Sequence, residues 1–170
     1  MGTNQRAQII MSPPEVTDFL QRSRTATVGS IGPGGLPHLV AMWYGIIGGA
    51  VYIETKTKSQ KAVNLRRDPR MVFMVEAGTS YDTLRGVSLE GNAVIIEESD
   101  GQEYWDAAIS VYERYTGPYT EQARPVLEFM MNKRIVAKLV PDRTRSWDHR
   151  KLGLDPLPTS GSTAAFIGAE

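Results

Sequence analysis

The sequence predicts a mainly β fold, a small and mostly antiparallel barrel of about six strands with flanking helices. Three observations support this prediction. Short β-rich runs follow one another along much of the 170 residues. Glycine-rich turns at Gly32–Gly35 and Gly48–Gly49 join neighbouring runs as hairpins. Strands and helices do not alternate regularly, which argues against a doubly wound parallel sheet.

Six runs have the composition of strands. They are residues 25–31, 36–47, 50–55, 70–76, 83–97 and 135–140. The fourth run is mostly apolar, as expected of a strand that is buried on both faces. In the middle of the fifth run, Gly91 indicates a bulge or a barrel corner.

Helices are expected near the start of the chain and between the later strands. Ser12-Pro13-Pro14-Glu15 has the pattern of a capping box with proline at the first helical position. Further helices are expected to begin near Ser59, Asp100 and Thr120, residue types that cap helix N-termini. The predicted domain spans residues 12–152, with a flexible leader over 1–11 and a flexible tail over 153–170.

Composition excludes several classes of protein and site. Lys+Arg and Asp+Glu both number 19, which argues against nucleic-acid binding driven by bulk charge. The absence of cysteine excludes disulfides and thiolate chemistry, and two histidines, His38 and His149, are too few for a three-histidine metal site in one chain. No apolar run approaches the ~20 residues of a membrane-spanning helix. Together with a polar N-terminus, this predicts a soluble, cytoplasmic protein without a metal.

The segment Thr55–Lys61 is the clearest candidate binding site. Lys56, Lys58 and Lys61 crowd the start of a predicted helix, where the macrodipole already supplies positive charge. Cations are unfavourable there unless an anion joins them. Hydroxyl, ammonium and backbone N–H groups that converge on one point suit a phosphate. A solvated basic turn is the alternative that the spacing alone leaves open.

Aromatic side chains and His38 are further candidates. Trp43 and Tyr44 are neighbours on a predicted strand, so one is expected to pack in the barrel and the other to line a cleft or a subunit seam. Trp147 follows the last predicted strand in a charged segment. There it either covers the cofactor pocket of a second subunit or holds the segment down. His38 either faces a ligand or is structural.

A more specific pattern surrounds the basic turn. Thr55-x-x-x-Ser59-x-Lys61 runs into Asn-Leu-Arg-Arg-Asp-Pro-Arg70, and further matching segments are residues 27–31, 36–39, 42–44, 81–87, 131–134 and 144–148. In these segments the chain resembles the split β-barrel flavin-binding superfamily named for pyridoxamine 5′-phosphate oxidase. It is most similar to the actinobacterial flavin/deazaflavin-dependent oxidoreductases of the B branch. The resemblance covers about residues 5–155.

The resemblance implies a six-stranded antiparallel split β-barrel and a homodimer with two cofactor sites at the subunit interface. It implies that the cofactor ring lies along the strand Leu39–Trp43, largely against its backbone, and that the phosphate lies at the basic turn. The strand Arg85–Val87 would pass near the cofactor. The cofactor-binding residues expected on this basis are His38, Val40, Ala41, Met42, Trp43, Thr55, Lys56, Lys58, Ser59, Lys61, Arg85 and Trp147.

Two cofactors fit the resemblance, coenzyme F420 and FMN. Both carry a phosphate at the same end of the ring, and F420 adds an anionic polyglutamate tail. The lysines of the turn, with Arg66, Arg67 and Arg70 nearby, offer more positive charge than one phosphate requires, which favours F420. Alternatively, these arginines form a solvated face near a helix C-terminus. The true oxidase carries an amide side chain at the position of Gly86, so pyridoxamine phosphate oxidation is not expected.

The predicted function is hydride transfer between F420 and a small conjugated or hydrophobic substrate. The cofactor would supply the chemistry and the protein its placement, with no acid–base side chain assigned. An FMN-dependent reductase or oxidase of the same fold is one alternative, and a non-catalytic flavin or deazaflavin carrier is another. No nucleic-acid partner and no membrane span are expected.

Overall fold

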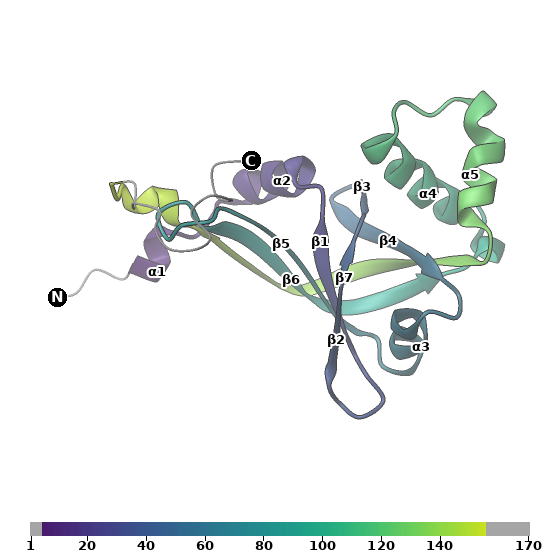
Figure 1. The fold of residues 1–170 in the computed structure, drawn as a ribbon, viewed down its shortest axis with the longest axis horizontal. Coiled ribbons are helices and arrows are strands. Elements are labelled where there is room, and N and C mark those ends of the chain that lie inside the picture. The colour runs from purple at the N-terminus through teal and green to yellow at the C-terminus, as the bar shows by residue number, and fades with distance from the viewer. Residues whose placement is uncertain (1–4, 156–170) are drawn as a thin grey trace, which may run out of the picture.

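One curled antiparallel sheet dominates the structure, a computed structural model that describes residues 5–155. Its strands follow the order β2-β1-β5-β6-β7-β4-β3 and form a half-barrel (Figure 1). The strands are β1 (Ala26–Ile31), β2 (Pro37–Met42), β3 (Gly45–Ile47), β4 (Ala50–Lys56), β5 (Arg70–Ala77), β6 (Arg85–Ile96) and β7 (Arg134–Asp148). The predicted fold class, mainly β with an antiparallel split barrel and flanking helices, is confirmed.

Helices flank the sheet at both ends. They are α1 (Gln5–Gln8), α2 (Pro13–Arg22), α3 (Gln60–Arg67), α4 (Gln102–Tyr115) and α5 (Arg124–Met131), with 3₁₀ turns η1 (Glu98–Asp100), η2 (Glu121–Ala123) and η3 (His149–Leu152). As predicted, Ser12 and Glu15 form a capping box at the start of α2. In Figure 1, α4 and α5 lie at one end of the molecule, while α1 and the end of β7 lie at the other.

The sheet has seven strands rather than the predicted six, because the run 36–47 is divided into β2 and β3. Tyr44 lies at the corner between them, fully buried, and its hydroxyl donates to the carbonyl oxygens of Leu20 (2.7 Å) and Ser23 (2.8 Å). These contacts hold the corner against the end of α2. At this corner the chain leaves β2, which pairs with β1, and enters β3, which pairs with β4.

Strand β7 is much longer than predicted. The predicted run ends at residue 140, but β7 continues through the charged segment to Asp148 beside β6. The predicted bulge is confirmed by a register shift between Glu90 and Gly91. A Cβ on Gly91 would lie 2.1 Å from the carbonyl oxygen of Val140, so a glycine is needed where the two backbones approach.

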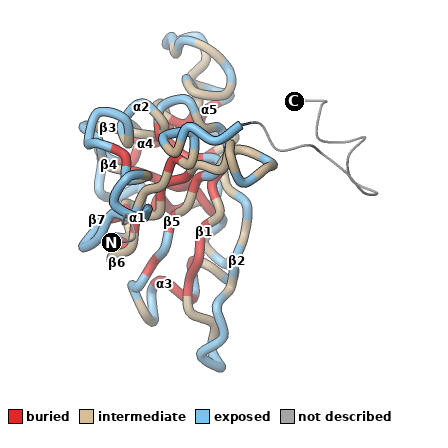
Figure 2. The backbone as a smooth tube through the Cα atoms, turned by 90° about the vertical axis from the view of Figure 1, so that its left-hand side faces the viewer, coloured by how far each residue is buried: buried red, intermediate tan, exposed pale blue. Residues whose placement is uncertain are grey.

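Two apolar cores support the fold. The larger one lies inside the curled sheet and includes Val28, Tyr44, Ile53 and Phe73, all buried. The second lies between the sheet and the helices α4 and α5, around Tyr104. Figure 2 shows buried segments along β1 and β5, while the tip of the hairpin between β1 and β2 is exposed. The candidate segment Thr55–Lys61 begins at the end of β4, a strand that contributes side chains to both cores.

Near its N-terminus the described chain is tied to the end of β7. The backbone N–H of Met11, a buried residue, donates to Ser146 Oγ (3.0 Å), and the N–H of Asp148 donates to the carbonyl of Ile9 (2.7 Å). The predicted domain boundaries at residues 11 and 152 stay predictions. Residues 1–4 of the expected leader and residues 156–170 of the expected tail lie outside the described part of the chain.

Candidate functional site

Three residues of the basic turn converge. Thr55 Oγ1 and Ser59 Oγ lie 2.8 Å apart, and Lys61 Nζ donates to Thr55 Oγ1 over 3.1 Å. Ser59 also accepts a hydrogen bond from the N–H of Ala62 (3.3 Å), so the predicted N-cap of α3 is confirmed. We call Thr55, Ser59 and Lys61 the anion cluster. It stands beside the first N–H groups of α3, which have no partners within the helix.

The electrostatics of the anion cluster favour a negative ligand. Burial lowers the pKa of the Lys61 ammonium, and the positive charge of Arg134 lowers it further. In the described part of the chain, the hydroxyl of Thr55 is the hydrogen-bond partner of Lys61, and no carboxylate forms an ion pair with it. A half-buried ammonium beside two hydroxyls and a helix N-terminus fits a phosphate group.

The other basic residues near the turn make different contacts. Lys56 Nζ donates to the carbonyl of Asn132 (2.8 Å), and Lys58 is exposed. The three arginines that were expected to add free positive charge each have a partner. Arg66 bonds the Thr57 carbonyl and Glu97, Arg67 bonds the Ile31 carbonyl, and Arg70 pairs with Asp68. The charge argument for a polyanionic cofactor is weaker than the sequence indicates.

Strand β2 presents its expected site residues on two faces. Val40 and Met42 pack against the barrel core, whereas Ala41 lies on the opposite face and is exposed. His38 shares the inward face and pairs in register with Ser30, and its Nδ1 is buried without a hydrogen-bond partner. A ligand along the outer side of β2 would therefore meet Leu39, Ala41 and the backbone of the strand.

Trp43 and Tyr44 face opposite ways, as predicted. Tyr44 is fully buried, whereas Trp43 is 55% exposed. The indole of Trp43 stacks on the ring of Tyr115 from α4, with centroids 4.4 Å apart and planes 3° from parallel. One face of Trp43 is therefore fixed by a contact that sequence spacing could not show, because Tyr115 is far away along the chain.

Arg85, the first residue of β6, and Trp147 of β7 lie where the C-terminal end of β7 pairs with β6. Trp147 pairs with Gly86, and a Cβ on Gly86 would lie 2.3 Å from the indole ring, so the ring occupies the space of a side chain at position 86. Trp147 thus lies within β7 rather than after the last strand. The guanidinium of Arg85 lies 6.0 Å from the ring centroid of Phe19 in α2. Neither residue is part of the anion cluster.

The pairing of the strands with β7 shows how far the anion cluster lies from Arg85 and Trp147. Thr55 pairs with Ile135 near the start of β7, and Gly86 pairs with Trp147 near its end. At roughly 3.3 Å per residue, about 40 Å of strand separates residues 135 and 147. The structure therefore brings Thr55, Ser59 and Lys61 together and leaves Trp147 remote from them within one chain.

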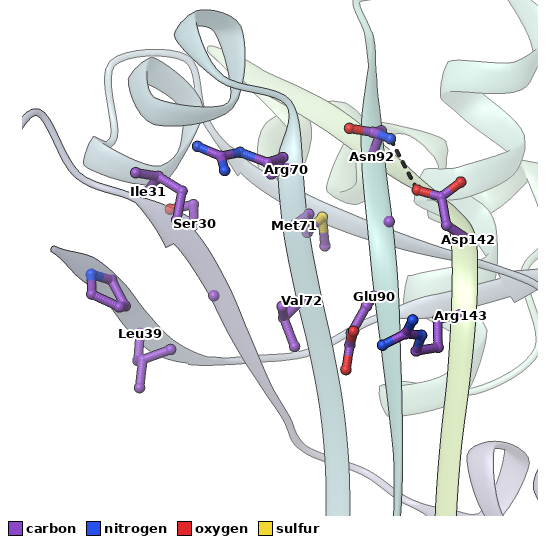
Figure 3. Close-up of a pocket in the computed structure, with 13 residues that line it drawn as sticks. Ser30, Ile31, Leu39, Arg70, Met71, Val72, Glu90, Asn92, Asp142 and Arg143 are labelled. Carbon is purple, nitrogen blue, oxygen red and sulfur yellow. Dashed lines mark hydrogen bonds between the residues drawn. The ribbon is translucent and has the colours of Figure 1, made fainter. Parts of the chain in front are cut away.

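A cavity of about 830 Å³ opens elsewhere on the sheet, over β1, β2, β5, β6 and β7 (Figure 3). Leu39, Gly29 and Val72 lie in register across three strands, and the missing side chain of Gly29 leaves a hollow between the other two. Leu39 is 65% and Val72 is 42% exposed. None of the twelve expected site residues lines this cavity.

Sequence reasoning missed two features beside the anion cluster. Glu54 is buried, and desolvation raises the pKa of its carboxyl to about 7, an effect that the charge of Arg134 opposes. The carbonyl of Lys133 accepts hydrogen bonds from both the N–H and the hydroxyl of Thr57. The sequence could have indicated the buried Glu54, because it is a charged residue within the apolar run 50–55. No sequence pattern indicates the contact between Lys133 and Thr57.

Residues 5–155 contain no group of three or more His, Asp or Glu side chains arranged to hold a metal ion. Over the same residues, no helix has both the length and the apolar character that crossing a membrane requires.

Comparison with known proteins places the chain in a family. Residues 12–148 match the family described as pyridoxamine 5′-phosphate oxidase. A crystal structure of a conserved hypothetical protein from Mycobacterium tuberculosis is 57% identical, with a TM-score of 0.89 over 95% of this chain and 99% of that chain. No curated protein matches the chain.

More distant structures share the fold. A structure described as an F420 reductase is 23% identical, with a TM-score of 0.59 over 78% of this chain and 98% of that chain. The heme storage protein HutZ from Vibrio cholerae is 15% identical, with a TM-score of 0.64 over 80% and 96% of the two chains. The match over residues 12–148 and the 57% identical structure show that this chain belongs to the pyridoxamine 5′-phosphate oxidase family of split β-barrels.

Proposed function

We propose that this protein is a homodimeric oxidoreductase that binds coenzyme F420 and transfers a hydride between it and a small conjugated or hydrophobic substrate. The observation that carries the proposal is the anion cluster, in which two hydroxyls 2.8 Å apart lie beside a lysine without a carboxylate partner among the described residues. Thr55, Ser59 and Lys61 would hold the cofactor phosphate at the N-terminus of α3.

The ring of the cofactor would lie along the outer side of β2. Ala41 is small and exposed there, and Val40 and Met42 point into the core, so the backbone of β2 would supply the polar contacts. Trp43, held against Tyr115, would border the ring or the substrate. A bound flavin or deazaflavin supplies hydride transfer, and the chain supplies binding and orientation.

A second copy of the chain would complete the site. Trp147 and Arg85 belong to the expected set but lie about 40 Å of strand away from the anion cluster. They would reach a cofactor only from another subunit. The row of Leu39, Gly29 and Val72 offers an exposed apolar surface on which that subunit would pack.

F420 is preferred to FMN for two reasons. The fold is shared with a structure described as an F420 reductase. Lys58 precedes Ser59 in the chain, and the backbone carbonyl of Lys133 bonds Thr57; both lysine side chains are exposed and would offer charge to a polyanionic tail. FMN, which needs the same phosphate site, is the alternative cofactor.

Equilibrium titration of F420 and of FMN into the purified protein tests the proposal. Lys61→Met should weaken the binding of the preferred cofactor by about 1.5–3 kcal/mol, the range for a hydrogen bond to a charged group. Arg22→Met removes one positive charge from an exposed position of α2, outside the expected binding residues, and is the matched control. Binding of neither cofactor, or equal effects of the two variants, would show that the anion cluster is not the phosphate site.

Mixed dimers test the contribution of the second subunit. Lys61→Met and Trp147→Ala homodimers should each bind cofactor weakly. In a heterodimer of the two, one site would combine intact Lys61 with intact Trp147, so half of the sites should regain wild-type affinity. If the heterodimer binds no better than the two homodimers, the two residues do not serve the same site.

A carrier that binds the cofactor without turnover is the second candidate function. It is favoured by the composition of the anion cluster, which contains no carboxylate or imidazole. Saturable oxidation of bound reduced cofactor by an added conjugated acceptor identifies an oxidoreductase. Tight binding without such turnover over a panel of acceptors would identify a carrier.

A further inference from the structure

The turn that carries the anion cluster is fixed from two sides by groups that do not belong to the cluster. On one side, the carbonyl of Lys133 accepts from Thr57 N (2.9 Å) and from Thr57 Oγ1 (2.7 Å). On the same side, Lys56 Nζ donates to the carbonyl of Asn132 (2.8 Å). The segment between α5 and β7 therefore holds the turn between β4 and α3.

The backbone at Lys133 is in a conformation that few residues adopt. Among the described residues that are not glycine, Lys133 alone has a positive φ, 56°. Such a conformation costs free energy and persists where surrounding contacts determine it. Here it accompanies a carbonyl that serves both donors of Thr57.

On the other side, Arg66 bridges the turn to the end of β6. One terminal nitrogen of Arg66 donates to the carbonyl of Thr57 (2.9 Å), and the other donates to Glu97 Oε1 (2.7 Å). Arg66 and Glu97 are both well exposed, so their pairing adds little to stability. Its consequence is geometric, because the planar fork can reach both acceptors only in one orientation.

We infer that Arg66, oriented by Glu97, is a positioning residue for anion binding, a role that rests on the proposed function. Arg66 bonds the carbonyl of Thr57, and the Lys133 carbonyl bonds its N–H and hydroxyl. The hydroxyls of Thr55 and Ser59 are thereby set at their 2.8 Å spacing before an anion arrives. A preorganised site loses less conformational freedom on binding, and precise sites depend on such supporting contacts.

Glu97→Gln separates this role from simple electrostatics because the two predict opposite signs. Removal of a negative charge near the cluster should strengthen anion binding if only Coulomb interactions matter. If Glu97 orients Arg66, the same change should weaken it. Arg66→Lys is the second variant, since lysine keeps the charge but has no planar fork with which to hold both acceptors.

The experiment compares ligands with and without a phosphate. FMN and riboflavin, and F420 and its phosphate-free deazaflavin core, are titrated into wild-type protein and into the Glu97→Gln, Arg66→Lys and Lys61→Met variants. We expect Glu97→Gln and Arg66→Lys to reduce the affinity ratio of phosphorylated to unphosphorylated ligand three- to tenfold. The affinity for the unphosphorylated ligand should remain unchanged, whereas a general distortion of the fold would lower both affinities together.

A ratio that stays the same or rises in Glu97→Gln overturns the inference, as does a parallel loss for both ligands. The Lys61→Met variant reports on the proposed function independently. If it leaves the ratio unchanged, the phosphate site lies elsewhere and the proposed function fails with the inference. If only Lys61→Met lowers the ratio, the anion cluster stands and the positioning role of Arg66 is rejected.

Discussion

At one end of β7, Arg134 pairs in register with Lys56 beside the anion cluster, and at the other end Trp147 lies against Gly86. The first region is held by hydrogen bonds among Thr55, Ser59 and Lys61. The second is held by packing, because the indole of Trp147 fills the space next to Gly86 that a side chain would otherwise occupy. The difference indicates that one chain orders the two regions separately, and that a shared ligand site would need two chains.

The bulge at Gly91 lies between the two ends of β7, and a substitution there should have the largest effect on stability. Gly91→Ala should lower the free energy of unfolding by about 3 kcal/mol, because the new Cβ meets a backbone oxygen at 2.1 Å that cannot move alone. Denaturant unfolding measures the change. Gly34→Ala is the control, since nothing lies within 4 Å of its Cβ position. Similar stability of the two variants would mean that β6 and β7 tolerate a regular register.

The buried carboxyl of Glu54, next to Thr55 of the anion cluster, should make the stability of the protein depend on pH. The pKa of Glu54 is about 7 in the folded state against 4.5 for the free group, so the folded protein binds the proton more tightly than the unfolded chain. Stability should therefore fall as pH rises from about 4.5 to 7. Glu54→Gln should remove this fall and stabilise the protein by about 3 kcal/mol at pH 8.

Urea unfolding of wild-type and Glu54→Gln protein at several pH values measures the difference. The pKa values of Glu15 and Asp68 are lowered to about 2, so their titration ends below this window. His38 and His149 are present in both proteins and cancel in the comparison. A constant difference between the two proteins from pH 4.5 to 8 would rule out the ionisation of Glu54 as the cause.

The tryptophan end is tested by a double-mutant cycle. Gly86→Ala should destabilise the protein by about 1–2 kcal/mol, since its Cβ meets the side chain of Trp147, which can move in part. In a Trp147→Leu background the same change should cost less than about 0.5 kcal/mol. Additive effects in thermal or denaturant unfolding would show that the indole does not define the space at Gly86.

The smallest effect concerns the lysines of the turn. Lys56→Met should weaken cofactor binding by less than about 1 kcal/mol, because its ammonium is exposed and bonded to the Asn132 carbonyl rather than to the anion cluster. Titration beside Lys61→Met gives the comparison. If Lys56→Met weakens binding as much as Lys61→Met does, the ligand reaches beyond the cluster toward Asn132.

Local patterns predicted much of this structure. The capping residues Ser12 and Ser59, the Gly48–Gly49 hairpin and the bulge at Gly91 all depend on neighbours in sequence or on glycine conformation, and all are confirmed. The division of the run 36–47 and the length of β7 were not predicted. Both depend on partners distant in sequence, such as the carbonyl of Leu20 for Tyr44 and Gly86 for Trp147.

Local sequence preferences account for the mainly β class, the turns and the composition of the anion cluster, because strand, cap and turn preferences act over a few residues. Which cations contact that cluster depends on the folded arrangement of distant segments. Lys61 joins it, whereas Lys56, Arg66, Arg67 and Arg70 bind carbonyl or carboxylate groups brought near by folding. The physical reason is that a long, charged side chain takes the partner within its reach, and distant segments supply those partners.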